Sequence, residues 1–137
     1  MVKAKIPLVV IILGLAAVLT GACAGQPAEP APPITPVSRE ESQRIAEEFL
    51  RNSPTFAYDG MEDTLQLTDT LTARCPYCWQ FIFEFQSRHA GYGDRTGQML
   101  AQVITPHQAK ITVEQGEVTH AVLDAKWDML SQTFIPK

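Results

Sequence analysis

The sequence predicts an α+β domain in which one N-terminal amphipathic helix packs on an antiparallel sheet of four to five strands. Two patterns lead to this prediction. A helix signal opens the folded part, and Trp79, Phe81, Phe83 and Phe85 then fall at every second position, which is the period of a β-strand. One face of that strand is therefore aromatic, and burying each ring is worth about 1.5–3 kcal/mol. The other elements are expected to cover this face.

The helix signal begins at Ser38, which is followed three residues later by Glu41. This spacing is typical of a capping box, in which the serine side chain binds a free backbone N–H of the first turn. An apolar stripe at helical spacing follows, formed by Ile45, Ala46, Phe49 and Leu50. Pro54 is expected to end the helix, because the residue before a proline avoids helical geometry.

Strands are expected after the helix, at residues 64–73, 78–86, 99–105, 109–113 and 118–123. Pro106 is expected to end the third of these. Gln115 and Gly116 predict a tight hairpin turn, since glycine tolerates the positive φ that such turns need. A short closing helix is expected at residues 124–130. One helix followed by consecutive strands indicates the α+β class.

The first 22 residues predict a signal peptide. A short basic start with two lysines precedes an uncharged apolar run over residues 6–19, and small residues follow. The run is shorter than the ~20 residues of an ordinary membrane span. Residues 23–37 contain five prolines and predict an extended tether, and residues 38–137 predict a single α+β domain.

Leu19 to Cys23 resembles the lipobox of bacterial lipoproteins, although Leu19 lies one position further from the cysteine than is usual in that family. The resemblance implies cleavage before Cys23, lipid on that cysteine, and an extracytoplasmic protein anchored to the cell membrane. Two or three acyl chains suffice for stable anchoring at ~0.8 kcal/mol per buried CH₂. The Ala22–Ala24 segment also fits an ordinary cleavage site, which would give a secreted protein.

The charge of the chain argues against two classes of partner. The whole sequence has a net charge of −4, which becomes −6 once the two lysines of the signal peptide are removed. No cluster of Lys or Arg is present to neutralise phosphates, so a nucleic-acid-binding protein is not expected. A polybasic contact with anionic lipid is not expected either.

The helix with Ile45, Ala46 and Phe49, together with the predicted hairpin from Ile111 to Asp124, resembles cystatin-like and PepSY-like extracytoplasmic domains. PepSY-like domains often belong to envelope lipoproteins. The resemblance implies a role in the regulation or inhibition of proteases.

The segment Cys75-Pro76-Tyr77-Cys78 is identical to the active-site motif of glutaredoxins. In that family the motif opens a helix, whose N-terminus lowers the thiol pKa. Here the alternating residues from Trp79 onward predict a strand. We therefore expect a structural disulfide between Cys75 and Cys78, which an oxidising compartment favours. A membrane-tethered thiol–disulfide oxidoreductase is the alternative, and a helix after Cys78 would favour it.

The same two cysteines have a spacing found in zinc sites. However, no second cysteine pair and no closely spaced pair of histidines accompanies them, since His89, His107 and His120 are far apart in the sequence. We therefore predict no metal site and no cofactor.

The polar segment from Ser87 to Gln98 is the candidate binding loop, with Tyr92, Asp94 and Arg95 as its candidate contact residues. Ordinary turn chemistry is the alternative, because three glycines lie within the segment. No nucleophile–base pair, phosphate loop or pair of catalytic carboxylates is identifiable. The sequence thus predicts a membrane-anchored extracytoplasmic lipoprotein with a small non-catalytic binding or regulatory domain, and its expected partner is an envelope protein or peptide.

Overall fold

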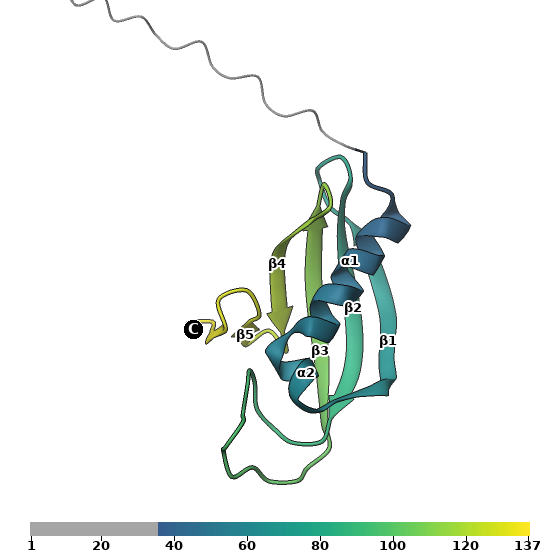
Figure 1. The fold of residues 1–137 in the computed structure, drawn as a ribbon. Coiled ribbons are helices and arrows are strands. Elements are labelled where there is room, and N and C mark those ends of the chain that lie inside the picture. The colour runs from purple at the N-terminus through teal and green to yellow at the C-terminus, as the bar shows by residue number, and fades with distance from the viewer. Residues whose placement is uncertain (1–35) are drawn as a thin grey trace, which may run out of the picture. The chain divides into compact units, whose positions relative to one another are not determined.

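The computed structural model describes residues 36–137. The expected signal peptide, the expected lipidation at Cys23 and nearly all of the expected tether lie outside the described residues. The described chain forms two helices, α1 (Arg39–Asn52) and α2 (Pro54–Asp59), and one antiparallel sheet of six strands (Figure 1). The α+β class and the antiparallel sheet are confirmed, and the sheet has six strands instead of four to five.

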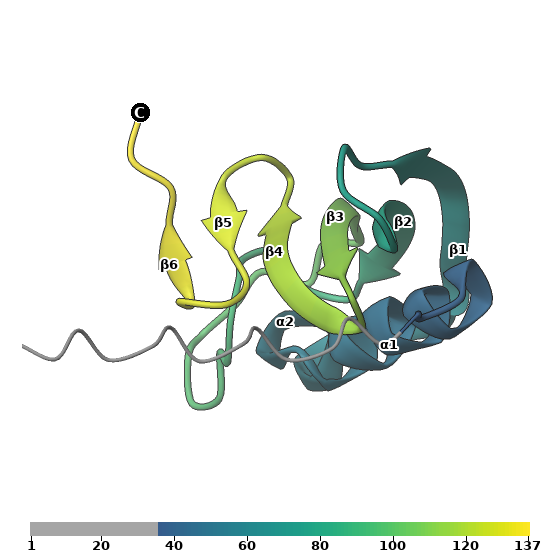
Figure 2. The ribbon, with the colours of Figure 1, turned by 90° about the horizontal axis from the view of Figure 1, so that it is seen from above.

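The strands pair in the order in which they occur in the chain, so the sheet is a simple meander. They are β1 (Gly60–Thr72), β2 (Cys78–Ser87), β3 (Thr105–Glu114), β4 (Glu117–Leu123), β5 (Trp127–Asp128) and β6 (Thr133–Phe134). Both helices lie on one face of this sheet (Figure 2).

Local sequence explains where the two helices begin and end. The Ser38 side chain accepts a hydrogen bond of 3.1 Å from the backbone N–H of Glu41, which caps α1. Pro54 does more than end α1, because it also occupies the first turn of α2, a helix that the sequence analysis did not predict. Proline is favoured there because the N–H that it lacks would have no partner. Within residues 36–137, no helix is both long and apolar enough to cross a membrane.

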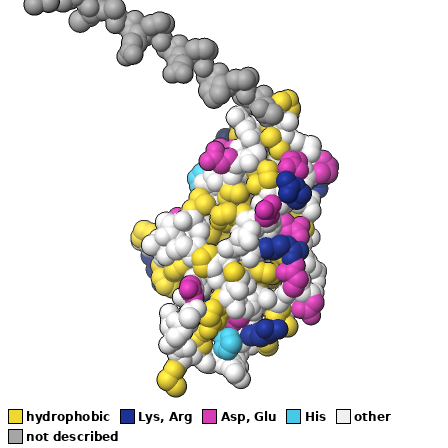
Figure 3. Space-filling model, in the orientation of Figure 1, with side chains coloured by type: hydrophobic (Ala, Val, Ile, Leu, Met, Phe, Trp, Pro, Cys, Tyr) yellow, Lys and Arg dark blue, Asp and Glu magenta, His cyan; other side chains and the backbone are white. Residues whose placement is uncertain are grey.

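The outer face of α1 is charged. An exposed ion pair joins Arg44 to Glu41, and a partly buried one joins Arg51 to Glu47, at 2.6 Å each. Figure 3 shows acidic and basic side chains intermingled on the side of the domain that carries this helix. Such pairs add only about 0.3–0.5 kcal/mol each, so α1 is held mainly by its buried face.

The core lies between the helices and the sheet. Phe81, Phe83 and Phe85 of β2 are between 0% and 2% exposed, and they share one apolar cluster with the fully buried Ala46 and Leu50 of α1. The alternation of β2 therefore predicts its buried face correctly. Trp79, at the start of the same strand, is only partly buried at the edge of the cluster.

The expected strand over residues 99–105 is wrong. β3 begins at Thr105 and continues through Pro106, while residues 99–104 form no strand. The apolar pattern of this segment suits a strand, but β2 is already paired with β3 over its whole length, from Cys78 to Ser87. Since β1 pairs with the other edge of β2, residues 99–104 find no free edge of β2 to pair with. Met99 is fully exposed.

The expected closing helix over residues 124–130 is also wrong. Asp124 and Ala125 both have positive φ angles, of 53° and 55°, and Lys126 N donates to Leu123 O at 3.0 Å across a tight turn. Two successive left-handed residues cannot continue a right-handed helix, whereas they match the twist of a hairpin. The chain therefore turns back as β5 and pairs with β4.

Replacing Phe83 by alanine should destabilise the domain by ~3–5 kcal/mol, because the change leaves a cavity in the core. Urea unfolding of the purified protein measures this loss. Phe134→Ala is the matched control, since the Phe134 ring is 64% exposed and its removal should cost much less. Equal midpoints for the two variants would contradict a core centred on β2.

Candidate functional site

The candidate binding loop joins β2 to β3 at one end of the sheet (Figure 1). Residues 36–38, which lead into α1, lie at the opposite end. The loop contains all three candidate contact residues, and the structure gives each of them a different environment.

Arg95 is buried and holds the loop in place. Its side chain is 2% exposed, and Nη2 donates to Asp59 Oδ1 at 2.7 Å. Nη1 donates to the backbone carbonyls of His89, Ala90 and Gly91, at 3.1 Å each. Removing one partner of such a buried pair typically costs about 3–5 kcal/mol. Arg95 therefore fixes the shape of the loop and is not available to contact a partner.

Three further residues form a hydrogen-bonded chain in the order of a hydrolase triad. Ser87 Oγ lies 3.0 Å from His107 Nε2, and His107 Nδ1 lies 2.7 Å from Asp124 Oδ2. However, Ser87 is fully buried, and its hydroxyl donates to His89 O at 2.7 Å. A hydroxyl has one hydrogen, so it cannot donate to His107 at the same time. The chain joins β2 and β3 to the turn after β4, and it does not present a nucleophile.

Tyr92 extends this chain. Its hydroxyl donates to Asp124 Oδ2 at 3.0 Å, and burial, together with the Asp124 charge, raises the pKa of Tyr92 to about 12. Burial by itself would raise the pKa of Asp124, but hydrogen bonds from His107 and from the backbone N–H of Gln108 outweigh it and lower that pKa overall. Asp124 is therefore held as a carboxylate, and Tyr92 as a neutral phenol.

Asp94 lies in an open groove between the loop and α2. The groove consists of two hollows of about 390 Å³ each, which share Pro54 and Asp94. We call it the Pro54 groove. Its other lining residues are Ala57, Tyr58, Tyr92, Gly93, Thr96, Gln98, Trp127 and Gln132.

The Pro54 groove combines aromatic rings with one negative charge. Tyr92 stacks on Trp127 with ring centroids 5.6 Å apart, and the exposed Phe134 meets Trp127 edge-on at 5.0 Å. The Asp94 carboxylate accepts hydrogen bonds from the hydroxyl and the N–H of Thr96, which lower its pKa. Its side chain is exposed, so the charge faces solvent.

Two polar atoms at the Trp127 end of the groove are enclosed and unpaired. Trp127 Nε1 and Gln132 Oε1 have no hydrogen-bond partner within residues 36–137. A buried polar group without a partner costs about 1–3 kcal/mol. One of these atoms donates and the other accepts, so together they match the two halves of an amide group.

Another hollow, of about 510 Å³, lies elsewhere and has a more polar lining than the Pro54 groove. Carboxylates of Asp63, Glu84 and Asp124 line it, together with three glutamines. Binding pockets are usually lined mainly by apolar and aromatic side chains that exclude water. The Pro54 groove fits that description better.

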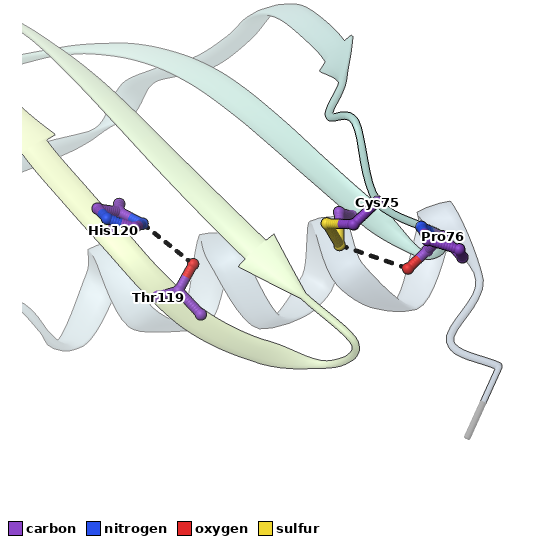
Figure 4. The surroundings of a disulfide bond; sticks show 5 residues. Cys75, Pro76, Thr119 and His120 are labelled. Atoms are coloured by element: carbon purple, nitrogen blue, oxygen red, sulfur yellow. Dashed lines mark hydrogen bonds between the residues drawn. A yellow bond between two sulfur atoms is a disulfide. The ribbon is translucent and has the colours of Figure 1, made fainter. Parts of the chain in front are cut away.

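The disulfide between Cys75 and Cys78 is present, as expected (Figure 4). It lies at the start of β2, whereas the loop follows the end of that strand. β2 begins at Cys78, which is 1% exposed, so a strand follows the motif. Neither helix of the described chain begins at these cysteines, and the helix N-terminus that lowers a thiol pKa in glutaredoxins is therefore missing here. Pro76 O lies 3.4 Å from the Cys78 sulfur, which carries no hydrogen to donate.

No family model matches the chain, and neither a curated protein nor a solved structure matches it. The candidate site also contains Asp59, Pro54, Trp127 and Gln132, which the sequence did not predict as site residues. Only Pro54 had a usable signal, because a proline after a serine can open a helix as well as end one. The other three are brought to the loop by the fold.

Asp124→Asn should reduce the acid sensitivity of the domain. Because folding lowers the pKa of Asp124, its contribution to stability is present above the unfolded value of ~3.9 and is lost as the pH falls through the folded value. Asparagine tolerates the positive φ of this position, so the turn is retained. Urea midpoints at about pH 6 and about pH 3 should show a difference between wild type and variant that shrinks in acid. A difference that stays constant with pH would contradict this role, and Asp69→Asn, exposed on β1, is the control.

Proposed function

We propose that this protein is a lipid-anchored extracytoplasmic lipoprotein whose non-catalytic domain binds an extended peptide segment of an envelope protein in the Pro54 groove. The signal pattern and Cys23 support the anchor. The observation that supports binding is an aromatic groove with one carboxylate, built on a loop that a buried ion pair holds in place.

The chemistry of the groove favours an extended peptide that contains proline and a basic residue. Tyr58, Tyr92 and Trp127 contribute aromatic lining to the groove. Arg95 covers one face of Tyr58, and Tyr92 stacks on Trp127, so parts of the rings are already in contact with the protein. Segments in polyproline II conformation dock on such rings, and they lose little entropy because they are already extended. Asp94 adds a negative charge between the two hollows, which favours Lys or Arg in the partner.

The unpaired atoms support a peptide ligand as well. The carbonyl of a peptide group can accept from Trp127 Nε1–H, and its N–H can donate to Gln132 Oε1. Both atoms are enclosed, so a ligand reaches them only after side chains at this end of the groove move. Satisfying both groups at once would remove their desolvation cost and add to the affinity.

The loop needs little reorganisation on binding. Arg95 and Asp59 hold its first half, and Gly93 N donates to Thr55 Oγ1 at 2.8 Å. A site that is already shaped loses less conformational entropy when a ligand binds.

The resemblance to PepSY-like domains makes an envelope protease a partner class within this proposal. The alternative function, thiol–disulfide exchange by Cys75 and Cys78, finds no support in a pair that is followed by a strand. Secretion without lipid remains the alternative for the localisation.

Cys23→Ala should release the protein from membranes or leave an uncleaved precursor, because the variant has no thiol to acylate. Membrane fractionation and fatty-acid labelling of cells measure both outcomes. Cys75→Ala is the control, and it should still be labelled. Equal labelling and equal membrane retention of wild type and Cys23→Ala would contradict the anchor.

A proline-rich peptide with one arginine should bind the Pro54 groove and shift the indole N–H signal of Trp127 in NMR spectra. The chain has two tryptophans, so Trp79, near the start of β2, serves as an internal reference. Asp94→Asn should weaken binding about 2- to 5-fold at low salt, as expected for an exposed charge pair worth up to ~1 kcal/mol. Asp69→Asn should have no effect. Shifts at neither indole, or equal shifts at both, would contradict the groove as the binding site.

A further inference from the structure

We propose that Cys75, Cys78 and Glu114 form a binding site for Zn²⁺ when the disulfide is reduced. The two sulfurs and a carboxylate oxygen of Glu114 lie within 4.8 Å of one another. Cys78 and Glu114 are directly opposite in the β2–β3 register. Opposite residues of an antiparallel pair share a face of the sheet, so the register itself brings these two side chains together.

The turn from Cys75 to Cys78 is held by backbone hydrogen bonds as well as by the disulfide. Ala73 N donates to Cys78 O at 3.0 Å, and Gln115 N donates to Tyr77 O at 3.0 Å. The second bond ties the cysteine turn to the turn between β3 and β4, next to Glu114. Since neither bond involves sulfur, reduction leaves both cysteines near the carboxylate.

Reduction requires a dithiol reductant. Its thiolate attacks the Cys75 sulfur, which belongs to a half-buried residue, and Cys78, 1% exposed, leaves as the thiolate. The second thiol of the reductant then attacks the mixed disulfide and releases Cys75. Two electrons and two protons reach the protein, and the reductant departs as its own disulfide.

Two thiolates and a carboxylate match the preferences of zinc. Zn²⁺ binds cysteine sulfur and carboxylate oxygen in tetrahedral sites, and three protein ligands leave the fourth position for water. Zinc binding displaces the two thiol protons. Glu114 makes no ion pair within the described part of the chain, so its carboxylate is available as a ligand. The sequence alone offered only the two cysteines, because Glu114 is distant from them along the chain.

The test uses the full-length protein in detergent, reduced with a phosphine, and titrated with Co²⁺ as a spectroscopic substitute for zinc. One Co²⁺ per chain should bind, with the visible absorption of a tetrahedral ion and a thiolate charge-transfer band, and Zn²⁺ should displace it. The oxidised protein should show neither band.

Cys75→Ser and Cys78→Ser should abolish both bands. Glu114→Gln should weaken binding at least as much as outer-shell changes do, which is roughly 10- to 100-fold. Glu117 is exposed and lies opposite Glu114 in the β3–β4 register. Glu117→Gln is therefore the matched control, and it should bind Co²⁺ as the wild type does. No uptake by the reduced protein, uptake equal in Glu114→Gln and wild type, or loss of the native NMR spectrum on reduction alone would overturn the proposal.

Discussion

The aromatic face of β2 must be shielded from water, and most of the arrangement follows from this constraint. Phe81, Phe83 and Phe85 can be covered only from one side, because they all project from the same face of the strand. Both helices lie on that side (Figure 2). The other face of β2 carries Gln80, Ile82, Glu84 and Gln86, which are half-buried or exposed. The strands on either side of β2 then add apolar side chains to the same layer, which is why the meander curves around α1.

Within residues 36–137, the fully buried ion pair, Arg95 with Asp59, lies at one end of this layered core. A guanidinium that loses its contact with water needs a carboxylate and several carbonyls in return, and α2 and the loop supply them. The same pair that makes Arg95 unsuitable for recognition gives the Pro54 groove a fixed wall. Within the candidate loop, burial thus separates the residue that holds the loop in place from Asp94, which faces solvent.

Each end of β2 carries residues that are typical of a catalytic site, but their structural surroundings do not suit catalysis. At its start, a motif identical to that of glutaredoxins leads into a strand, so no helix N-terminus stabilises a thiolate. At its far end, Ser87 belongs to a triad-like chain but is fully buried. In both cases the residue types fit a catalyst, whereas exposure and the neighbouring backbone favour a structural role in the oxidised protein.

The sequence alone determined the features that depend on neighbouring residues: the cap at Ser38, the alternation of β2, and a disulfide between cysteines three positions apart. The strand expected at residues 99–105 is wrong because apolar periodicity does not say which strand edges are already paired. The expected closing helix is wrong because Asp124 and Ala125 adopt positive φ angles and turn the chain back. The role of Arg95 depends on Asp59, which is 36 positions away. Only the packing of distant segments decided which charges pair and which tryptophan lines a groove. The sequence does not show this, since burial is a property of the folded chain.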